Sequence, residues 1–388
     1  MREEASLAEI YLDNSATTKI IPQAAEAMAE AGSLVYGNPS SLHGKGLEAE
    51  KLLKGTREIL AENLSCTPEE IFFTSGGTES NNWAILGCLH RRRRRGKHII
   101  STKIEHPSVL KVCQYLEEEG YQVTYLGTDS TGIIDLEELK ETLREDTVLV
   151  SVMYVNNETG AIQPVEEIGR FLKEARRDIV FHVDAVQAFG KIPLNPAKAG
   201  IDLLSLSAHK IHGPKGVGAL FISKGVAVDP LLRGGEQENG MRPGTENVPG
   251  IAAFGAAVKF IPKWLEESSR VYSLKEQLIK LLRQRVPEMV VNGSPDRAIP
   301  YIVNLSFPGI KGEVLVHYLE QYGIYVSTGS ACHSRSGGSS HVLTALGLDK
   351  ERLEGAIRVS FSYFNRPEEI EQAAGKIADA VIDLQSLR

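Results

Sequence analysis

The sequence predicts an α/β protein with a large domain built on a mostly parallel, seven-stranded sheet and a smaller α+β domain. Between residues 71 and 223, short apolar runs alternate with amphipathic stretches, which is the pattern of β-α-β units. After residue 262, a long charged helical stretch precedes shorter strands and a terminal helix. The 388 residues are enough for both parts, at ~150 residues per domain. We therefore expect a large domain that ends near residue 260 and a small domain over 261–388, while these patterns leave open to which of them residues 1–70 belong.

The predicted elements follow in chain order. The segment up to residue 70 is mainly helical, with a Gly/Pro-rich bend at 36–46. Seven apolar runs are the predicted strands of the main sheet: 71–74, 98–101, 122–125, 148–153, 179–183, 203–205 and 218–222. Residues 164–177 are a predicted helix, because Pro164 opens the segment and Ile168 and Leu172 share one face. A long helix at 264–285, strands at 301–306 and 357–361 and a terminal helix form the second part.

The composition, with 42% hydrophobic and 24% charged residues and a mean hydropathy of -0.15, is that of a globular protein rather than a disordered one. The net charge of -7 argues against direct nucleic-acid binding, which needs clustered positive charge. Arg91–Arg95 is a local exception. It follows a helix-like stretch and precedes a strand, so we predict a solvated connecting loop, with contact to an acidic partner as the alternative.

The four cysteines, Cys66, Cys88, Cys113 and Cys332, include no CxxC pair for a metal or redox site, and four are too few for a disulfide-rich framework. The first residues lack the apolar core of a signal peptide, and no run approaches the ~20 apolar residues of a membrane helix. We therefore expect a cytoplasmic protein with reduced thiols and no membrane partner.

Polar residues follow several of the predicted strands, and ligands of open α/β sheets bind beyond the carboxyl ends of the strands. A glycine turn with Gly77 and Thr78 follows the first strand and precedes a predicted helix at 82–89, which suits a phosphate group. Taken alone, such a turn is more often only a turn. His106 follows the second strand, where its ring could stack on a flat cofactor, act as an acid or base, or simply be a structural residue.

Three further positions extend this pattern. Asn157 follows the fourth strand, and its amide suits a ring hydroxyl or a substrate carboxylate, although amides are also common in turns. Asp184 follows the fifth strand, and a buried acid there needs a partner such as a protonated ring nitrogen. Lys210 lies in a loop of small residues, where a desolvated amine is suited to Schiff-base chemistry, while Lys215 in Gly-Pro-Lys-Gly is more typical of a surface turn. Together, these residues are the parts of a pyridoxal phosphate site.

Cys332 differs from the other three cysteines. It lies in a Gly/Ser-rich segment beside His333 and Arg335, whose positive charge would favour the thiolate. The others fall in helix-like patterns or before a turn, which is typical of inert packing. Arg358 lies in a short apolar strand, where it could bind an amino-acid carboxylate or form a structural ion pair.

At this point the sequence resembles the NifS/IscS-type cysteine desulfurases, which are fold-type I pyridoxal phosphate enzymes of the class V aminotransferase group. The resemblance spans nearly the whole chain and rests on eight ordered motifs: Tyr11–Thr18, Gly37–His43, Thr74–Asn82, Val155–Glu158, His182–Gln187, Ser207–Gly216, Arg242–Thr245 and Gly329–Cys332.

This resemblance implies a role for each candidate residue. Lys210 would form the Schiff base with pyridoxal phosphate, His106 would stack on its ring and Asp184 would hold its ring nitrogen. The remaining cofactor contacts implied are Gly77, Thr78, Asn157, Gln187, Ser207 and His209, together with Thr245, which would reach the cofactor of the partner subunit in a homodimer. Asn157 and Arg358 would bind the L-cysteine substrate.

The resemblance also implies the chemistry. Lys210 or His106 would move the α-proton, and Cys332 would take the sulfur as a persulfide, leaving L-alanine. The acceptor would be an iron-sulfur scaffold or a tRNA-thiolation protein. No resident metal is implied, although Cys332 could act as a transient iron-sulfur ligand.

Three features depart from the family pattern: His333 after the cysteine, Pro243 in Arg242–Thr245 and a short helical tail after Arg358. Two rival functions are an aminotransferase or selenocysteine lyase of the same fold, and a non-catalytic sulfur-relay protein. Cys332 argues against an aminotransferase, and the Ser-Ala-Cys pattern argues against a selenocysteine lyase. Lys210, His106 and Asp184 argue against a non-catalytic protein.

Overall fold

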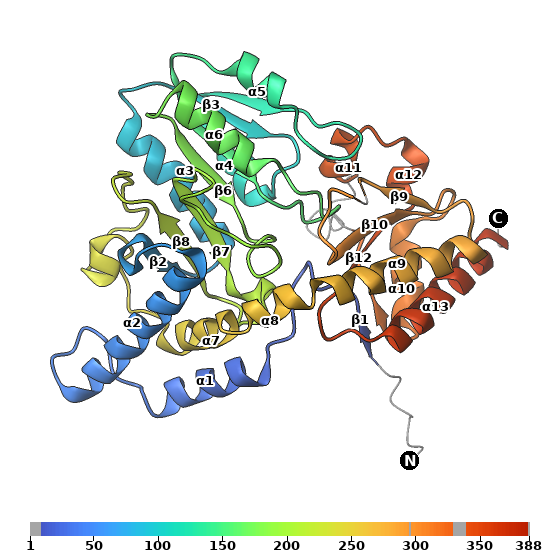
Figure 1. The fold of residues 1–388 in the computed structure, drawn as a ribbon, viewed down its shortest axis with the longest axis horizontal. Coiled ribbons are helices and arrows are strands. Elements are labelled where there is room, and N and C mark those ends of the chain that lie inside the picture. The colour runs from blue at the N-terminus through green and yellow to red at the C-terminus, as the bar shows by residue number, and fades with distance from the viewer. Residues whose placement is uncertain (1–8, 295, 329–338, 387–388) are drawn as a thin grey trace.

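The structure, a computed structural model, describes residues 9–294, 296–328 and 339–386. Its centre is a seven-stranded sheet with the strand order β2-β8-β7-β6-β5-β3-β4 (Figure 1). The strands are β2 (Ile71–Thr74), β3 (His98–Thr102), β4 (Gln122–Leu126), β5 (Thr147–Met153), β6 (Val180–Asp184), β7 (Leu203–Ser207) and β8 (Gly218–Ile222). Only β8 runs antiparallel to its neighbours, which are β7 and β2. The predicted mostly parallel sheet is therefore confirmed.

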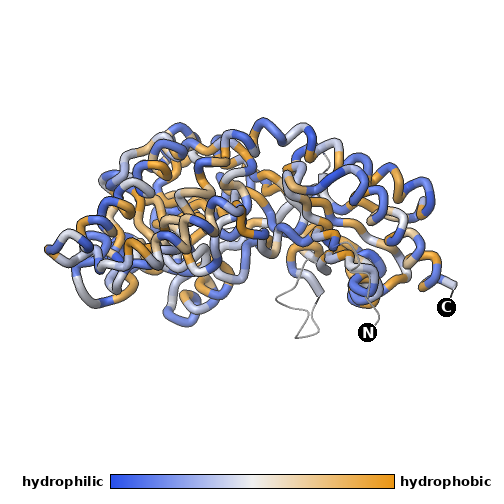
Figure 2. Tube along the Cα trace, turned by 90° about the horizontal axis from the view of Figure 1, so that it is seen from below, coloured by the Kyte–Doolittle hydropathy of each residue, from blue (hydrophilic) through white to orange (hydrophobic). Residues whose placement is uncertain are grey.

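Helices cover both faces of this sheet, and alternate residues of a strand point to opposite layers. Leu149 of β5 packs in the apolar cluster of α3 (Gly77–Arg92) and α4 (Pro107–Glu118). Its neighbour Val150 packs in the cluster that includes α2 (Gly44–Leu64), α6 (Val165–Ala175) and α7 (Val248–Val258). Hydrophobic segments accordingly run through the middle of the molecule (Figure 2).

The second part contains an antiparallel sheet of order β12-β10-β9 and a parallel pair of strands. The sheet strands are β9 (Val290–Asn292), β10 (Ile302–Ser306) and β12 (Ala356–Ser360), packed with α9 (Ser268–Arg285), α10 (Gly312–Glu320) and α13 (Pro367–Ser386). The pair joins β1 (Ile10–Tyr11) to β11 (Ile324–Tyr325). The other helices are α1 (Pro22–Ser33), α5 (Leu136–Thr142), α8 (Ile261–Glu266), α11 (His341–Ala345), α12 (Lys350–Glu354) and the 3₁₀ turns η1 (Pro68–Glu70), η2 (Ala208–Lys210) and η3 (Gln237–Gly240).

Three local predictions need correction. The helix predicted over 82–89 begins at Gly77, because the glycine turn itself forms the first helical turn. The helix predicted over 264–285 is two helices that meet at Glu267, next to a Ser-Ser pair whose hydroxyl groups compete for backbone hydrogen bonds and so disfavour a helix interior. Arg91 and Arg92 are the last residues of α3 rather than part of a loop, where positive charge complements the helix dipole.

The close approach of α6 to the loop before β7 makes a testable prediction. A Cβ on Gly169 would lie 1.8 Å from the carbonyl oxygen of Ala199, so the backbone of one segment would have to move. We expect Gly169→Ala to lower the free energy of unfolding by about 2 kcal/mol in denaturant titrations. Gly375→Ala in α13 is the matched control, because no heavy atom lies within 4 Å of its added Cβ. Equal stabilities of the two variants would contradict this packing constraint.

Candidate active site

A cavity of about 320 Å³ lies at the sheet edge where β2, β3, β5, β6 and β7 end. This edge is where the sequence predicts the ligand. Most of the predicted site residues line the cavity: Gly77, Thr78, His106, Asn157, Asp184, Gln187, Ser207, His209, Lys210 and Arg358. The fold therefore brings together residues that lie up to 281 positions apart, since 358 − 77 = 281.

Lys210 ends a single 3₁₀ turn that directly follows β7. Its Nζ donates hydrogen bonds to the carbonyl oxygens of Ser15, at 2.5 Å, and Ala16, at 2.7 Å. These oxygens belong to the segment that follows β1. A half-buried amine held by backbone carbonyls at the wall of a cavity is placed for attack on a carbonyl compound.

A chain of hydrogen bonds connects Asp184 with His106. Asn81 donates to Asp184 Oδ2 at 2.7 Å and to Ser108 Oγ at 2.8 Å. His106 Nδ1 lies 2.8 Å from the same Ser108 Oγ and accepts from the Ser108 backbone N–H. Because Nδ1 is an acceptor here, the neutral ring carries its proton on Nε2.

Burial lowers the pKa of two of the histidines that line the cavity, so that both are mainly neutral at pH 7. It lowers the pKa of His106, and the charge of Lys210 adds to this effect while Asp184 opposes it. Burial and the nearby Lys210 lower the pKa of His209 to about 3. His106 can therefore act as a neutral ring against a flat ligand or as a proton acceptor.

The residues after β2 and β7 fit a phosphate group. Gly76 has φ of +147°, a conformation that favours glycine. A Cβ on Gly77 would lie 2.6 Å from Val186 Cγ2 and 3.7 Å from Ser207 Cβ, so only glycine leaves this space open. Ser207 Oγ is buried and has no hydrogen-bond partner. An unsatisfied hydroxyl beside the first turn of α3 is what a phosphate oxygen would complete.

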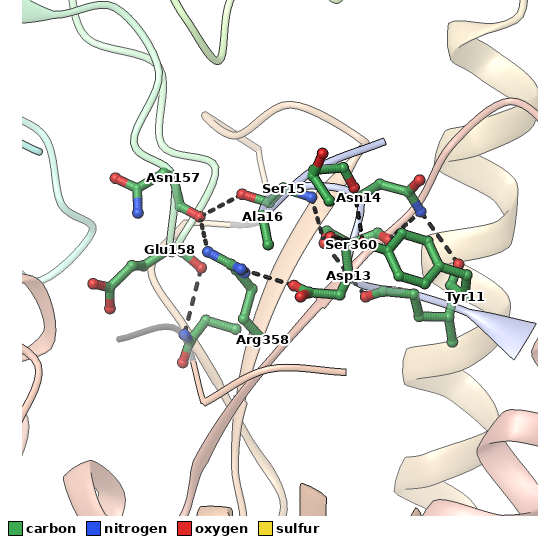
Figure 3. A network of polar contacts seen from close by, with 12 residues as sticks. Tyr11, Asp13, Asn14, Ser15, Ala16, Asn157, Glu158, Arg358 and Ser360 are labelled. Atoms are coloured by element: carbon green, nitrogen blue, oxygen red, sulfur yellow. Dashed lines mark hydrogen bonds and ion pairs between the residues drawn. The ribbon is translucent and has the colours of Figure 1, made fainter. Parts of the chain in front are cut away.

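Arg358 of β12 is buried and joins three parts of the chain (Figure 3). It forms an ion pair of 2.8 Å with Asp13 and donates to the Asn157 carbonyl oxygen at 2.9 Å. Ser15 Oγ donates to the same Asn157 oxygen at 2.8 Å. Arg358 therefore forms the structural ion pair that its sequence context allowed, and it also lines the cavity, where its Nε–H has no partner.

One described site residue does not line the cavity, and one predicted site residue lies outside the described ranges. Thr245 is exposed. Cys332 lies outside the described residues, as do His333 and Arg335. Among the other cysteines, Cys88 and Cys113 are buried, which confirms their predicted packing role, and Cys66 is half-buried. Burial raises the pKa of these thiols to about 12 for Cys66, 11 for Cys88 and 12 for Cys113, so they are protonated at pH 7.

The prediction missed several residues that line the cavity. Asn81, Ser15 and Ser108 do not directly follow a strand, so the rule that located the other residues does not select them. Asn81 lies one helical turn after Gly77, and this i, i+4 spacing is the signal that could have found it. Glu158 and His341 also line the cavity. No sequence pattern marks His341, whose Nε2 donates to the Glu105 carbonyl oxygen at 2.9 Å.

Glu105 is a buried acid next to His106. Its Oε1 accepts from the Met153 N–H and from Thr102 Oγ1, both at 2.8 Å, while Oε2 has no partner. Burial raises the pKa of Glu105 to about 8, so the carboxyl group is largely protonated at pH 7.

Over the described ranges, no helix is long and apolar enough to cross a membrane. The same part of the chain contains no group of three or more His, Cys, Asp or Glu side chains placed to hold a metal ion.

An amine suited to a Schiff base shares a cavity with a carboxylate and a phosphate-sized space, at the carboxyl edge of a mostly parallel sheet. This arrangement defines the class of fold-type I pyridoxal phosphate enzymes.

Comparison with known proteins identifies the family within this class. The aminotransferase class-V family matches residues 10–373. The cysteine desulfurase IscS of Methanosarcina thermophila is 45% identical over 379 residues, which cover 97% of this chain and 93% of the relative.

Solved structures agree. A NifS-like protein superposes with a TM-score of 0.90 at 41% identity, covering 96% of this chain and 98% of the other. The structure of SspA in complex with cysteine gives a TM-score of 0.82 at 35% identity, covering 92% and 100% of the two chains. The chain belongs to the class-V aminotransferase family and, within it, to the pyridoxal phosphate-dependent cysteine desulfurases.

The raised pKa of Glu105 predicts a pH-dependent stability difference. Its folded pKa of about 8 exceeds the ordinary value of 4.5, so the wild-type protein loses stability as the pH rises between these values. Glu105→Gln, which mimics the protonated acid, removes this loss. In denaturant titrations, we compare the free energy of unfolding of the variant with that of the wild type. We expect the difference, variant minus wild type, to be about 2 kcal/mol larger at pH 7.5 than at pH 5.5. A constant difference would show that Glu105 is ionised in the fold.

The space beside Gly77 predicts a binding defect. In Gly77→Ala, the new methyl group meets Val186 and narrows the phosphate space, so retention of pyridoxal phosphate should fall at least about tenfold. Visible absorbance after dialysis measures this retention, and Gly375→Ala again serves as the control. Full retention of pyridoxal phosphate by Gly77→Ala would show that the segment around Gly77 does not bind the phosphate.

Proposed function

We propose that this cavity removes the sulfur of L-cysteine, releases L-alanine and delivers the sulfur through Cys332 to an acceptor protein. The observation that carries the proposal is the shared cavity of Lys210, Asp184 and Arg358, which combines a Schiff-base amine, a carboxylate for a ring nitrogen and a cation for a substrate carboxylate.

The proposed cofactor contacts fall into groups according to the part of pyridoxal phosphate that each residue binds. Lys210 holds pyridoxal phosphate covalently, Asp184 holds the ring nitrogen and His106 stacks on the ring. Gly77, Thr78, Ser207 and His209 hold the phosphate, while Asn157 and Gln187 contact the ring oxygen. When bound, the cofactor withdraws electrons from the substrate α-carbon and so makes its proton acidic. The bond from Asn81 supports Asp184 in this role because it fixes the orientation of the carboxylate.

Substrate binding and proton transfer are assigned to the chain's own groups. Arg358 binds the substrate carboxylate, with Asn157 beside it, while Asp13 and the Asn157 carbonyl oxygen hold the guanidinium in place. The Lys210 amine accepts the α-proton once substrate has displaced it, and His106, whose pKa is lowered, can accept or return a proton at neutral pH.

Cys332 is the proposed sulfur acceptor. Its thiolate attacks the substrate sulfur, so that an S–S bond forms while the C–S bond breaks, and the electron pair of the C–S bond stays on the carbon skeleton, which becomes L-alanine after protonation. The raised pKa values of Cys66, Cys88 and Cys113 support this assignment, because protonated, packed thiols are poor nucleophiles. A reducing compartment, which we take to be the cytoplasm, keeps Cys332 reduced.

We also propose a homodimer whose subunits share the site, with Thr245 reaching the phosphate of the partner subunit's cofactor. The exposure of Thr245 supports this idea. So do the large exposed apolar side chains on and between α1 and α2: Met28, Leu34, Tyr36, Leu42 and Leu47. The sulfur acceptor proposed is an iron-sulfur scaffold or a tRNA-thiolation protein.

The proposed division into domains is 15–260 and 1–14 with 261–388. The pairing of β1 with β11 supports the assignment of the first residues to the smaller domain. The bridge between Asp13 and Ser360 extends the same contact.

Sulfide and alanine production from L-cysteine, measured with a reductant, tests the function. We expect Cys332→Ser and Lys210→Ala each to lose at least about a hundredfold in kcat, because each removes a nucleophile. The matched controls are Cys66→Ser and Lys215→Ala, which should retain activity because Cys66 is a packing residue and Lys215 is exposed. Undiminished turnover by Cys332→Ser would rule out the persulfide role, and a protein that binds no pyridoxal phosphate would overturn the whole proposal.

A further inference from the structure

Lys191 is a buried lysine that the proposed reaction does not use. Its side chain is 9% exposed, and Nζ donates a 2.7 Å hydrogen bond to Gln187 Oε1. Lysines are almost never buried without a specific partner. For Lys191 that partner is a neutral amide rather than a carboxylate, so the bond does not compensate for burying a charge. The burial of Lys191 therefore needs another explanation.

The hydrogen bonds of Gln187 explain why a lysine is buried at this position. Its Nε2 donates to the Ser15 carbonyl oxygen at 2.9 Å and to Ser15 Oγ at 3.1 Å. A glutamine amide has one accepting and one donating edge, and a lysine ammonium can only donate. Lys191 therefore fixes the amide with Oε1 on the lysine and Nε2 directed toward Ser15. The same Ser15 oxygen accepts from Lys210, so the donor edge of Gln187 lies next to the Schiff-base amine.

The charges around Lys191 are mostly positive. Burial, Lys210 and Arg358 lower the pKa of Lys191 to about 7, and Lys191 in turn lowers the pKa of His209 and His212. No carboxylate contributes to this shift. The neutral amine keeps two N–H donors, so the bond from Lys191 to Gln187 Oε1 can form in either protonation state.

We infer that Lys191 is a positioning residue that presents the donor edge of Gln187 to the ring oxygen of the cofactor. This inference rests on the proposed function, in which Gln187 contacts that oxygen and Lys210 forms the linkage to the cofactor. A donor stabilises the anionic ring oxygen and so weakens its hold on the proton of the neighbouring linkage nitrogen. Without Lys191, the amide can turn its acceptor edge toward the site.

The test is a pH titration of the visible absorption band of the holoenzyme, which reports the protonation of the linkage between Lys210 and the cofactor. In Lys191→Met, we expect the midpoint to rise by roughly one pH unit, because both the oriented donor and a nearby cation are lost. Lys191→Arg keeps the donor and the charge and should return the midpoint to near the wild-type value. An unchanged midpoint in Lys191→Met would overturn the inference.

Two further variants make the result specific. Lys275→Met removes the other buried lysine of the described chain, which lies in α9 and bonds only the Ile299 carbonyl oxygen, at 3.4 Å. It should leave the midpoint unchanged, and a shift equal to that of Lys191→Met would mean a general effect of unfolding. Gln187→Glu removes the donor edge while Lys191 stays, so the midpoint of this variant should also rise. If Lys191→Met does not fold, the result for Gln187→Glu decides whether the inference holds. A wild-type protein without the absorption band would instead refute the role of Lys210.

Discussion

The carboxyl ends of five buried strands lie at one edge of the central sheet, and the side chains that follow them share a single cavity. Inside the sheet, backbone groups satisfy one another. Beyond its edge, peptide and side-chain groups need other partners. The cavity depends on this constraint, because Ser207 Oγ and Asn81 Oδ1 are buried there without a protein partner. The same geometry that ends the strands therefore leaves hydrogen-bonding capacity for a polar cofactor.

The segment that follows β1 completes the cavity from the other side. Asp13 pairs with Arg358 of β12, and Ser15 accepts hydrogen bonds from both Lys210 and Gln187. A few residues near the start of the chain therefore join the antiparallel sheet to the loop after β7. Because these contacts are hydrogen bonds of buried groups, a shift of either sheet would disturb the lysine and the arginine together.

Much of the fold could be predicted from the sequence. The strands β2 and β8 match their apolar runs to the residue, since a strand buried on both faces is continuously apolar. The start of α3 could not be read in this way, because Gly77, Thr78 and Ser80 have low helix propensity and are held by tertiary contacts. The strand-end rule found Lys210 and Asp184, but not Ser15 or Asn81. Ser15 contributes its backbone oxygen, which carries no side-chain signal, and Asn81 acts from inside a helix.

The raised pKa values of the three described cysteines make them poor sites for holding sulfur. Thiols whose pKa is about 11 or 12 exchange slowly with persulfides near pH 7, because the thiolate is the attacking species. Sulfur on the proposed acceptor Cys332 is therefore not expected to transfer to Cys66, Cys88 or Cys113. With Cys332 as the proposed acceptor, the storage capacity would be one sulfane sulfur per chain. A second turnover would then wait until the first sulfur has left Cys332, which would tie the consumption of cysteine to the supply of empty acceptor.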